Sequence, residues 1–241
     1  MNLVNTVTTA VNYGIKLTEF AGGIRFGTDS LLVSEFCPRC RNAVDLGSGS
    51  GVIGLMLLAS GRAKTVSGVE ISPEYARLAV RNAGQNGFSQ EYSCVCADVA
   101  DVKRHFRAGM FGLCVSNPPY LPAKTGLTNE SGLKHAAFHE TTADIGGFCA
   151  AAAYLLKYGG KFCCVYRPEY LQRLISAAGE NGLALKRLRF VHPDKNSPPS
   201  LLLAEFRKGG GAGASVMPPL FIYDDAEHKI FGAETQRTIS R

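Results

Sequence analysis

Strand-like runs alternate with helix-like segments through most of the chain, and this alternation limits the possible folds more than any other feature. The strand candidates are residues 43–47, 65–70, 91–97, 111–116 and 161–166, and the helix candidates between them are 50–60, 73–86, 99–106 and 140–157. Pro73 suits the first turn of its helix, Ser72 suits the N-cap, and Gly87 suits the position after the helix ends. This order predicts a doubly wound, mostly parallel sheet.

The C-terminal part of the sheet departs from a purely parallel arrangement. A helix candidate at 168–181 precedes two strand candidates, 183–192 and 201–206, which the loop 193–199 joins. Such a short loop cannot make a parallel crossover, so these two strands are predicted to be antiparallel neighbours. The expected fold is α/β: a doubly wound, seven-stranded, mostly parallel, Rossmann-like sheet with a C-terminal antiparallel strand pair.

Composition places the chain among ordinary globular proteins. Its 241 residues are 46% hydrophobic and 19% charged, which is enough to bury a large core. No apolar run approaches the roughly 18 residues that span a bilayer, and the N-terminus lacks the pattern of a signal peptide. We therefore expect a cytoplasmic protein without membrane contact. The net charge of +6 suits an anionic partner but identifies none.

Eight cysteines raise the question of a metal site. Cys37 and Cys40 have the spacing of half a zinc site, which requires a second pair. The others lie mostly in strand-like runs, at Cys94, Cys96, Cys114, Cys149, Cys163 and Cys164. We expect reduced, mostly buried thiols and no metal.

A glycine-rich turn, VDLGSGSGVIG at 44–54, joins the first strand to the first helix. Glycines allow a tight turn and let a ligand approach the helix N-terminus. The spacing Gly49, Gly51, Gly54 matches a dinucleotide pattern, but only weakly. Asp45 stands just before the turn, where its charge would oppose a pyrophosphate and would suit a cationic ligand. The turn therefore favours a positively charged ligand over NAD.

Two further acids end the next two strands. Glu70 can accept hydrogen bonds from both hydroxyls of a ribose, and Asp98 can accept one from an adenine amino group. Open α/β sheets bind ligands at this edge. A ligand with a positive centre, a ribose and an adenine is S-adenosylmethionine. The glycine turn with these acids resembles the pattern of class I S-adenosylmethionine methyltransferases over residues 43–207.

Asn117-Pro118-Pro119-Tyr120 follows the fourth strand. Two prolines alone could simply end a strand. An exocyclic amine on a base, however, is a poor nucleophile, and two acceptors aimed at its N–H bonds would activate it. The Asn117 side-chain oxygen and the Pro118 carbonyl can be these acceptors, Pro119 stiffens the turn, and Tyr120 can stack on a flipped-out base. The motif resembles that of amino-methyltransferases, which modify adenine N6, guanine N2 or a glutamine amide.

Residues 23–30, GIRFGTDS, narrow the resemblance. Thr28 or Asp29 can cap the helix that follows. The stretch also resembles one in the tRNA1(Val) adenine-37 N6-methyltransferase family, where it closes over the methionine end of the cofactor. Further similar segments are 139–140, 166–169, 186–193 and 218–220, whereas Phe138 stands where that family's pattern has arginine.

The resemblance implies a set of site residues and a division of the chain. Catalysis falls to Asn117, Pro118, Pro119 and Tyr120. S-adenosylmethionine is expected to contact Thr28, Asp29, Asp45, Gly47, Ser48, Gly49, Gly51, Glu70, Ile71, Asp98, Val99 and Asn117. Lys186, Arg187 and Arg189 are candidates for contact with an RNA backbone. The expected parts are an N-terminal hairpin and helix over the cofactor (1–42), the methyltransferase domain (43–207), and a glycine-rich linker with a tail (208–241).

Three functions remain open on the sequence. The preferred one is N6-methylation of adenine in tRNA, at adenine 37 of a valine tRNA. The second is methylation of another amine, such as a ribosomal guanine N2 or a protein glutamine; glutamine methyltransferases usually carry a helical domain before the glycine turn, and only 44 residues precede Asp45. The third is a non-catalytic RNA-binding module, which would be free to lose Asn117 or the glycines.

Overall fold

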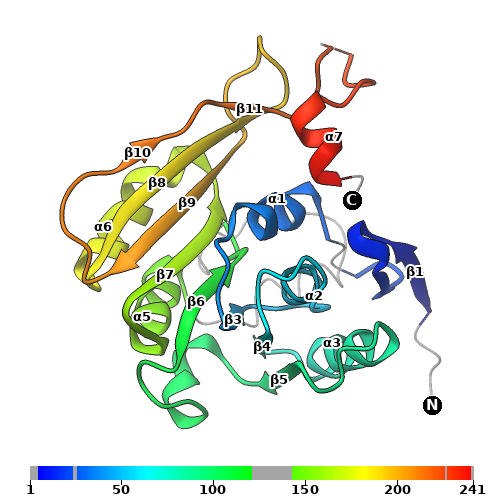
Figure 1. The fold of residues 1–241 in the computed structure, drawn as a ribbon, viewed down its shortest axis with the longest axis vertical. Helices are drawn as coiled ribbons and strands as arrows, with labels where there is room; N and C mark the ends of the chain where they lie inside the picture. Colours follow the sequence, from blue (N-terminus) through cyan, green and yellow to red (C-terminus); the bar gives the residue numbers. More distant parts are fainter. Residues whose placement is uncertain (1–4, 24–25, 121–142, 226, 240–241) are drawn as a thin grey trace.

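The fold is that of a computed structural model, which describes residues 5–23, 26–120, 143–225 and 227–239. Its centre is one sheet in the order β10-β8-β9-β7-β6-β3-β4-β5 (Figure 1). The seven long strands are β3 (Asn42–Leu46), β4 (Thr65–Glu70), β5 (Tyr92–Cys96), β6 (Phe111–Ser116), β7 (Leu156–Tyr166), β8 (Leu183–His192) and β9 (Leu201–Lys208). From β5 to β7 all neighbours are parallel, and β9 is antiparallel to both β7 and β8. The predicted fold class is confirmed.

Two short strands from the tail extend the sheet beyond β8. β10 (Ser215–Val216) and β11 (Leu220–Phe221) both pair with β8 in parallel. Backbone hydrogen bonds fix the arrangement, since Met217 N donates to Leu188 O at 2.8 Å and Ile222 N donates to His192 O at 2.9 Å. This part of the tail thus docks on the body of the protein.

Helices cover both faces of the sheet. One face carries α1 (Thr28–Phe36), α2 (Val52–Ala59) and α3 (Pro73–Gln85), and the other carries α5 (Ile145–Leu155) and α6 (Leu171–Glu180) with the 3-10 segment η2 (Val99–Arg104). The remaining short segments are η1 (Asn12–Gly14), η3 (Pro168–Tyr170) and α7 (Ala233–Ile239). The α3 start is as predicted, with Ser72 Oγ accepting from Tyr75 N. Each face encloses its own hydrophobic cluster.

The helix predicted at 140–157 differs from the observed α5. Asp144 caps α5, because its Oδ1 accepts from Gly147 N at 3.2 Å. The helix ends at Leu155, since Leu156 is the first residue of β7 and pairs with Phe111. Residues 140–142 lie outside the described residues.

An N-terminal hairpin packs against α3. It consists of β1 (Thr6–Ala10) and β2 (Lys16–Phe20), paired antiparallel. The completely buried Asn82 of α3 joins the hairpin to the glycine turn: its Nδ2 donates to Thr18 O and to Ser50 O, both at 2.9 Å, and its Oδ1 accepts from Thr18 N at 3.0 Å. Three segments far apart in the sequence therefore share one amide.

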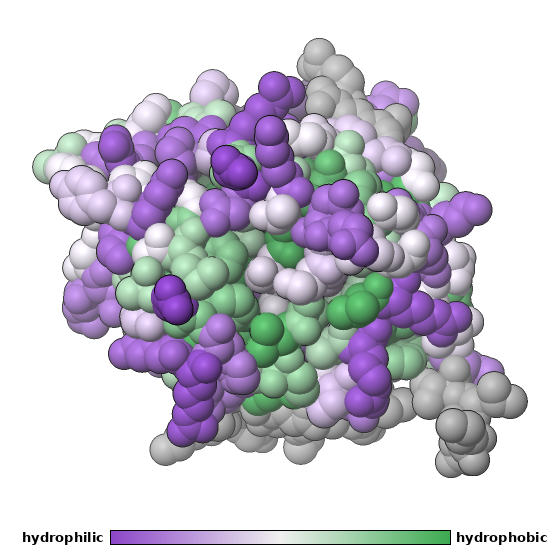
Figure 2. All heavy atoms as spheres, turned by 60° about the horizontal axis from the view of Figure 1, so that its bottom comes forward, coloured by the Kyte–Doolittle hydropathy of each residue, from purple (hydrophilic) through white to green (hydrophobic). Residues whose placement is uncertain are grey.

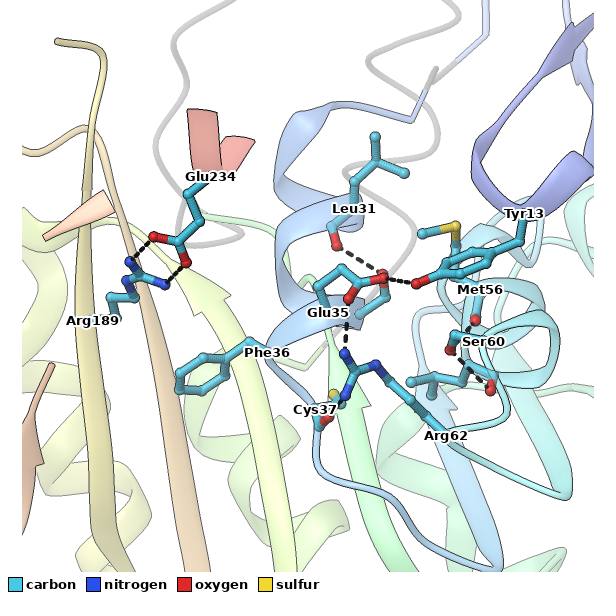
Figure 3. A network of polar contacts seen from close by, with 12 residues as sticks. Tyr13, Leu31, Glu35, Phe36, Cys37, Met56, Ser60, Arg62, Arg189 and Glu234 are labelled. Atoms are coloured by element: carbon cyan, nitrogen blue, oxygen red, sulfur yellow. Dashed lines mark hydrogen bonds and ion pairs between the residues drawn. The ribbon is translucent and has the colours of Figure 1, made fainter. Parts of the chain in front are cut away.

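α1 is held in place by a polar network behind its C-terminal half (Figure 3). Glu35 accepts from Tyr13 of the hairpin and from Arg62 Nη2, the latter at 2.8 Å. Arg62 Nη1 also donates to Cys37 O at 2.8 Å. These contacts connect the hairpin, α1 and the segment after α2.

The surface in Figure 2 carries hydrophilic residues over most of the face, with hydrophobic residues gathered near its middle. Large apolar side chains that remain exposed belong to different elements, for example Val80 (46%) on α3 and Met110 (45%) before β6. Single exposed apolar residues are normal in folded proteins. Within the described ranges, no helix has the length and hydropathy to cross a membrane.

Candidate active site

A cavity of about 280 Å³ opens at the carboxyl ends of β3, β4, β5 and β6. Its wall consists of Phe26, Gly27, Asp29, Ser30, Gly47, Ser48, Gly49, Ser50, Val52, Ile53, Val69, Glu70, Ile71, Tyr75, Ala97, Val99, Asn117, Pro118, Pro119, Tyr120 and Phe148. The glycine turn, the start of α1 and the Asn-Pro-Pro-Tyr turn therefore face a common space. This is the edge at which α/β sheets bind ligands.

The glycine turn leaves open space at the cavity. Gly49 has a φ of +54°, and a Cβ there would meet no atom within 4 Å. Gly51 has a φ of +87°, and a Cβ there would lie 3.1 Å from the Ala79 Cβ, so this glycine serves the packing of the turn on α3. The backbone conformation thus requires glycine at both positions, but only Gly49 leaves its space to a ligand.

Glu70 lies at the end of β4 and lines the cavity. Its Oε2 accepts from Gly49 N at 2.8 Å, and its Oε1 accepts from Ser72 N at 2.9 Å. The carboxylate is thereby fixed between the glycine turn and the start of α3. A fixed carboxylate at this position suits a pair of ribose hydroxyls.

We expect Glu70→Ala to raise the Kd for S-adenosylhomocysteine by roughly tenfold or more, because a charge-assisted hydrogen bond contributes about 1.5–3 kcal/mol. Isothermal titration calorimetry measures this directly. Glu91→Ala, which removes a carboxylate before β5 and away from the cavity wall, is the matched control. Equal affinities of the Glu70 and Glu91 variants would contradict a cofactor contact at Glu70.

Two of the three predicted acids do not line the cavity. Asp45 is completely buried beneath the glycine turn, and within the described residues neither carboxylate oxygen has a hydrogen-bond partner. Burial raises the pKa of Asp45 to about 7, and the Gly54 amide offsets part of the rise without meeting hydrogen-bond geometry. Asp98 caps η2, with Oδ1 accepting from Ala100 N at 2.9 Å. Its neighbours Ala97 and Val99 reach the wall instead.

Thr28 and Gly51 also lie off the wall, whereas the other predicted cofactor residues are on it. Those on it are Asp29, Gly47, Ser48, Gly49, Glu70, Ile71, Val99 and Asn117. Direct cofactor contacts by the four residues off the wall stay predictions. Asp45 is off the wall because its side chain is completely buried.

The Asn-Pro-Pro-Tyr turn reaches the same cavity and forms a polar cluster with the start of α1. Asn117 Nδ2 donates to Asp29 Oδ2 at 3.0 Å and lies 3.4 Å from Ser30 Oγ. The Tyr120 hydroxyl lies 2.9 Å from Asn117 Oδ1 and 3.0 Å from Asp29 Oδ2. All four predicted catalytic residues are therefore on the wall.

The Tyr120 ring is held by aromatic and cationic neighbours. Tyr166 of β7 meets it edge to face at 5.8 Å between centroids, and the Arg167 guanidinium lies 5.0 Å from its centre. Burial is the main cause that raises the Tyr120 pKa, and Asp29 adds to it while Arg167 acts in the opposite direction. Tyr120 therefore stays protonated at neutral pH and acts as a hydroxyl.

Several wall residues escaped prediction from the sequence. Phe148 comes from α5 and packs beside the glycine turn: a Cβ on Gly47 would lie 3.6 Å from the Phe148 ring. Tyr75 comes from the first turn of α3, and Phe26 and Ser30 flank the predicted Thr28 and Asp29. Phe26 and Ser30 could have been predicted from their proximity along the chain to Thr28 and Asp29. No local signal marks Phe148, because only the folded sheet brings α5 to the glycine turn.

The candidate RNA-binding cations are engaged within the protein. Arg187 Nη2 lies 2.6 Å from Glu205, and Arg189 forms two hydrogen bonds with Glu234 at 2.6 and 2.7 Å (Figure 3 shows the second pair). Lys186 Nζ donates to carbonyls of the glycine-rich linker. Their contact with RNA stays a prediction, and their pairing shows that each also has a structural role.

A second cavity, of about 430 Å³, lies between the C-terminal half of α1, β8 and the tail. Arg187 and Arg189 line it together with Arg62, and each of the three has a glutamate partner. The three guanidinium charges that line the cavity are therefore compensated within the protein.

The structure holds no cluster suited to a metal in its described part, where no three or more His, Cys, Asp or Glu residues come together. All eight cysteines are free thiols, and five of them are buried. Burial raises the pKa of most of them, including Cys40 to about 11 and Cys149 to about 12, which favours the protonated thiol at neutral pH. Phe138, His139 and Glu140 lie outside the described residues.

The cavity residues fit S-adenosylmethionine. Gly49 leaves open space, Glu70 presents a fixed carboxylate, and Ile71 and Val99 offer an apolar surface for an adenine. When bound, this cofactor supplies an electrophilic methyl group on a sulfonium centre. The residues that would hold it are Ser48, Gly49, Glu70, Ile71 and Val99.

Comparison with known proteins agrees with this geometry. A protein from Photobacterium profundum, named tRNA1(Val) (adenine(37)-N6)-methyltransferase, is 27% identical over 211 residues, which cover 86% of this chain and 87% of the relative. A protein of the same name from Porphyromonas gingivalis is 29% identical over 192 residues, covering 76% and 74%.

Solved structures share the fold. The crystal structure of a predicted O-methyltransferase from Agrobacterium tumefaciens matches with a TM-score of 0.70 at 22% identity, covering 87% of this chain and 94% of that one. A geranyl diphosphate C-methyltransferase from Streptomyces coelicolor A3(2), solved with S-adenosyl-L-homocysteine, matches with a TM-score of 0.55 at 14% identity, covering 73% and 74%.

The family model "Methyltransferase small domain" matches residues 21–178, from the end of the hairpin to α6. The predictions of a class I methyltransferase fold, of an enzyme dependent on S-adenosylmethionine, and of that compound as the cofactor are confirmed. The chain belongs to the methyltransferase small domain family.

Proposed function

We propose that the protein transfers a methyl group from S-adenosylmethionine to the N6 amino group of an adenine in tRNA, at position 37 of a valine tRNA, in the cytoplasm. The observation that carries the proposal is the presence of Asn117 and Pro118 on the wall of the cavity formed by the glycine turn and Glu70. The names of the similar proteins from Photobacterium and Porphyromonas support the same substrate.

The Asn-Pro-Pro-Tyr turn has the chemistry that an aromatic amine requires. The lone pair of adenine N6 is delocalised into the ring, so the amine gains nucleophilicity only when its N–H bonds are drawn out of the base plane. Asn117 Oδ1 and the Pro118 carbonyl are two acceptors that can take these hydrogens and stabilise the positive charge that develops. Tyr120 lies beside them, where its ring can contact the base.

The proposal extends to the parts of the chain. Residues 1–42 would cover the cofactor, 43–207 would perform the transfer, and 208–241 would form a linker and tail beside β8. The position of Asp29 and Ser30 on the cavity wall supports the first assignment.

The test uses purified protein, S-adenosylmethionine with a tritiated methyl group, and total tRNA from a strain that lacks the gene. We expect label in tRNA, recovered after nuclease digestion as N6-methyladenosine and mapped to adenine 37 of a valine tRNA. Label at another adenine would support the proposed reaction but would assign it to a different position in the tRNA. Label in protein or in guanine, or none in any RNA, would refute the proposal.

A further inference from the structure

Asn117 has one polar neighbour that distinguishes the two ends of its amide. Its Nδ2 donates to Asp29 Oδ2 at 3.0 Å and lies 3.4 Å from Ser30 Oγ. A carboxylate can only accept hydrogen bonds, whereas a hydroxyl can donate or accept. Asp29 therefore binds only the nitrogen end of the amide, and Ser30 would tolerate either end.

The direction of this amide decides whether the turn can receive an amine. The nitrogen and oxygen ends of asparagine have nearly the same size, so shape alone does not fix the orientation. With the nitrogen on Asp29, Oδ1 is left to accept from an incoming N–H. A reversed Asn117 would present its own N–H groups to the N–H groups of the amine, which would repel it.

The Tyr120 hydroxyl is compatible with this orientation at the other end of the amide. It lies 2.9 Å from Asn117 Oδ1 and 3.0 Å from Asp29 Oδ2, and its single proton can serve only one of them at a time. When an amine donates to Oδ1, the hydroxyl can turn its proton to Asp29. Both acceptors then remain satisfied before and after the substrate arrives.

Asp29 is itself held in place. Its Oδ1 accepts from Ser30 N at 2.9 Å, and a Cβ on Gly27 would lie 2.6 Å from the same oxygen. Glycine at position 27 thus leaves room for the carboxylate in its observed rotamer. The network of Glu35 and Arg62 holds the helix that carries it.

We propose that Asp29 is a positioning residue that sets the direction of the Asn117 amide, with the Tyr120 hydroxyl as its movable partner. The inference rests on the proposed function, in which Asn117 receives an amine. Resemblance to the family suggests that Asp29 contacts the cofactor. The proposed role is different, because Asp29 here acts on another side chain of this protein.

The first test is Asp29→Asn, which keeps the shape but can present either a donor or an acceptor to Asn117. We expect kcat at saturating cofactor and tRNA to fall by roughly ten- to a hundredfold, a range typical of misplaced reacting groups. The Kd for S-adenosylhomocysteine, measured by calorimetry, should change by less than about threefold. An unchanged kcat with a raised Kd would overturn the inference and would show that Asp29 binds the cofactor instead.

Glu74→Gln is the matched control, because it also converts a carboxylate to an amide in the first turn of a helix on the same face of the sheet. Glu74 is exposed and does not line the cavity, so kcat should stay within about twofold of wild type. An equal fall in both variants would show that loss of charge, rather than loss of orientation, causes the effect.

The second test exchanges the carboxylate and the amide between positions 29 and 117. Asn117→Asp places two carboxylates together and should be nearly inactive. Adding Asp29→Asn gives an amide that can donate to one carboxylate oxygen and leaves the other oxygen as the acceptor. We expect the double variant to exceed Asn117→Asp by about tenfold in kcat, and no gain would overturn the inference.

A measurement without activity separates this inference from the proposed function. In ¹⁵N-labelled protein free of ligand, the Asn117 side-chain amide signal is the one absent from Asn117→Asp. Its protons should exchange with solvent more slowly in wild type than in Asp29→Asn, and equal rates would contradict the contact. If wild type labels no tRNA, the proposed function fails while this measurement still decides the role of Asp29.

Discussion

Asn117→Ala is expected to lower kcat by about a hundred- to a thousandfold, the loss that follows removal of one group placed to stabilise charge in a transition state. Asn117 Oδ1 is the side-chain acceptor of the turn, and alanine leaves only the Pro118 carbonyl. Single-turnover transfer to tRNA, with cofactor and enzyme in excess, measures the effect on the chemical step. Affinity for S-adenosylhomocysteine should remain within about threefold of wild type, since Glu70 and Gly49 are untouched.

Asn181→Ala is the control for this change. Asn181 ends α6, where its Nδ2 donates to Ala177 O, and it lies outside the cavity wall. Its removal should leave transfer within about twofold of wild type. If Asn117→Ala instead lost cofactor binding and kept its rate at saturation, Asn117 would be a binding residue and the proposed chemistry would be wrong.

Asp45→Asn is expected to stabilise the protein at pH 8 and to have little effect near pH 4. Burial raises the pKa of Asp45 from 3.8 to about 7, so the folded state keeps a proton that the unfolded state loses. Below about pH 4 both states hold the neutral group and there is no penalty. As the pH rises from about 4 to about 7, the free energy of unfolding falls, by about 4 kcal/mol at 1.36 kcal/mol per unit.

Thermal unfolding of wild type and variant from pH 4.5 to 8 checks this result. The gap in Tm between Asp45→Asn and wild type should widen as the pH rises and level off above about pH 7. A constant gap for Asp45 would mean that its ionisation is not coupled to folding.

The sequence predicted which elements meet at the cavity more reliably than which side chains face it. In open α/β sheets, ligands bind at the carboxyl ends of the strands. The glycine-rich turn and the acid at a strand end therefore place Gly49 and Glu70 at the same edge of the sheet from sequence alone. The rule does not say how deep a side chain lies. Asp45 and Asp98 end neighbouring strands like Glu70, yet one is buried below the turn and the other caps η2.

Contacts between distant segments were the least predictable part. Asp29 and Asn117 were each identified as site residues, but 88 positions separate them, and nothing in either motif indicates that they hydrogen-bond. Phe148 lies on a largely apolar helix whose sequence gives no reason to prefer it over its neighbours. The end of α5 was placed two residues too late, because Leu156 and Lys157 belong to β7.

The tail strands have a consequence for how the protein behaves at high concentration. An open sheet presents unpaired backbone groups at its outermost strands, and another chain can pair with them. Along β8, Met217 N and Ile222 N donate hydrogen bonds to backbone carbonyls. Pro218 and Pro219, which lack backbone donors, lie in the connection between the two short strands. The tail therefore occupies, at these positions, backbone groups of β8 that another strand would otherwise be able to pair with.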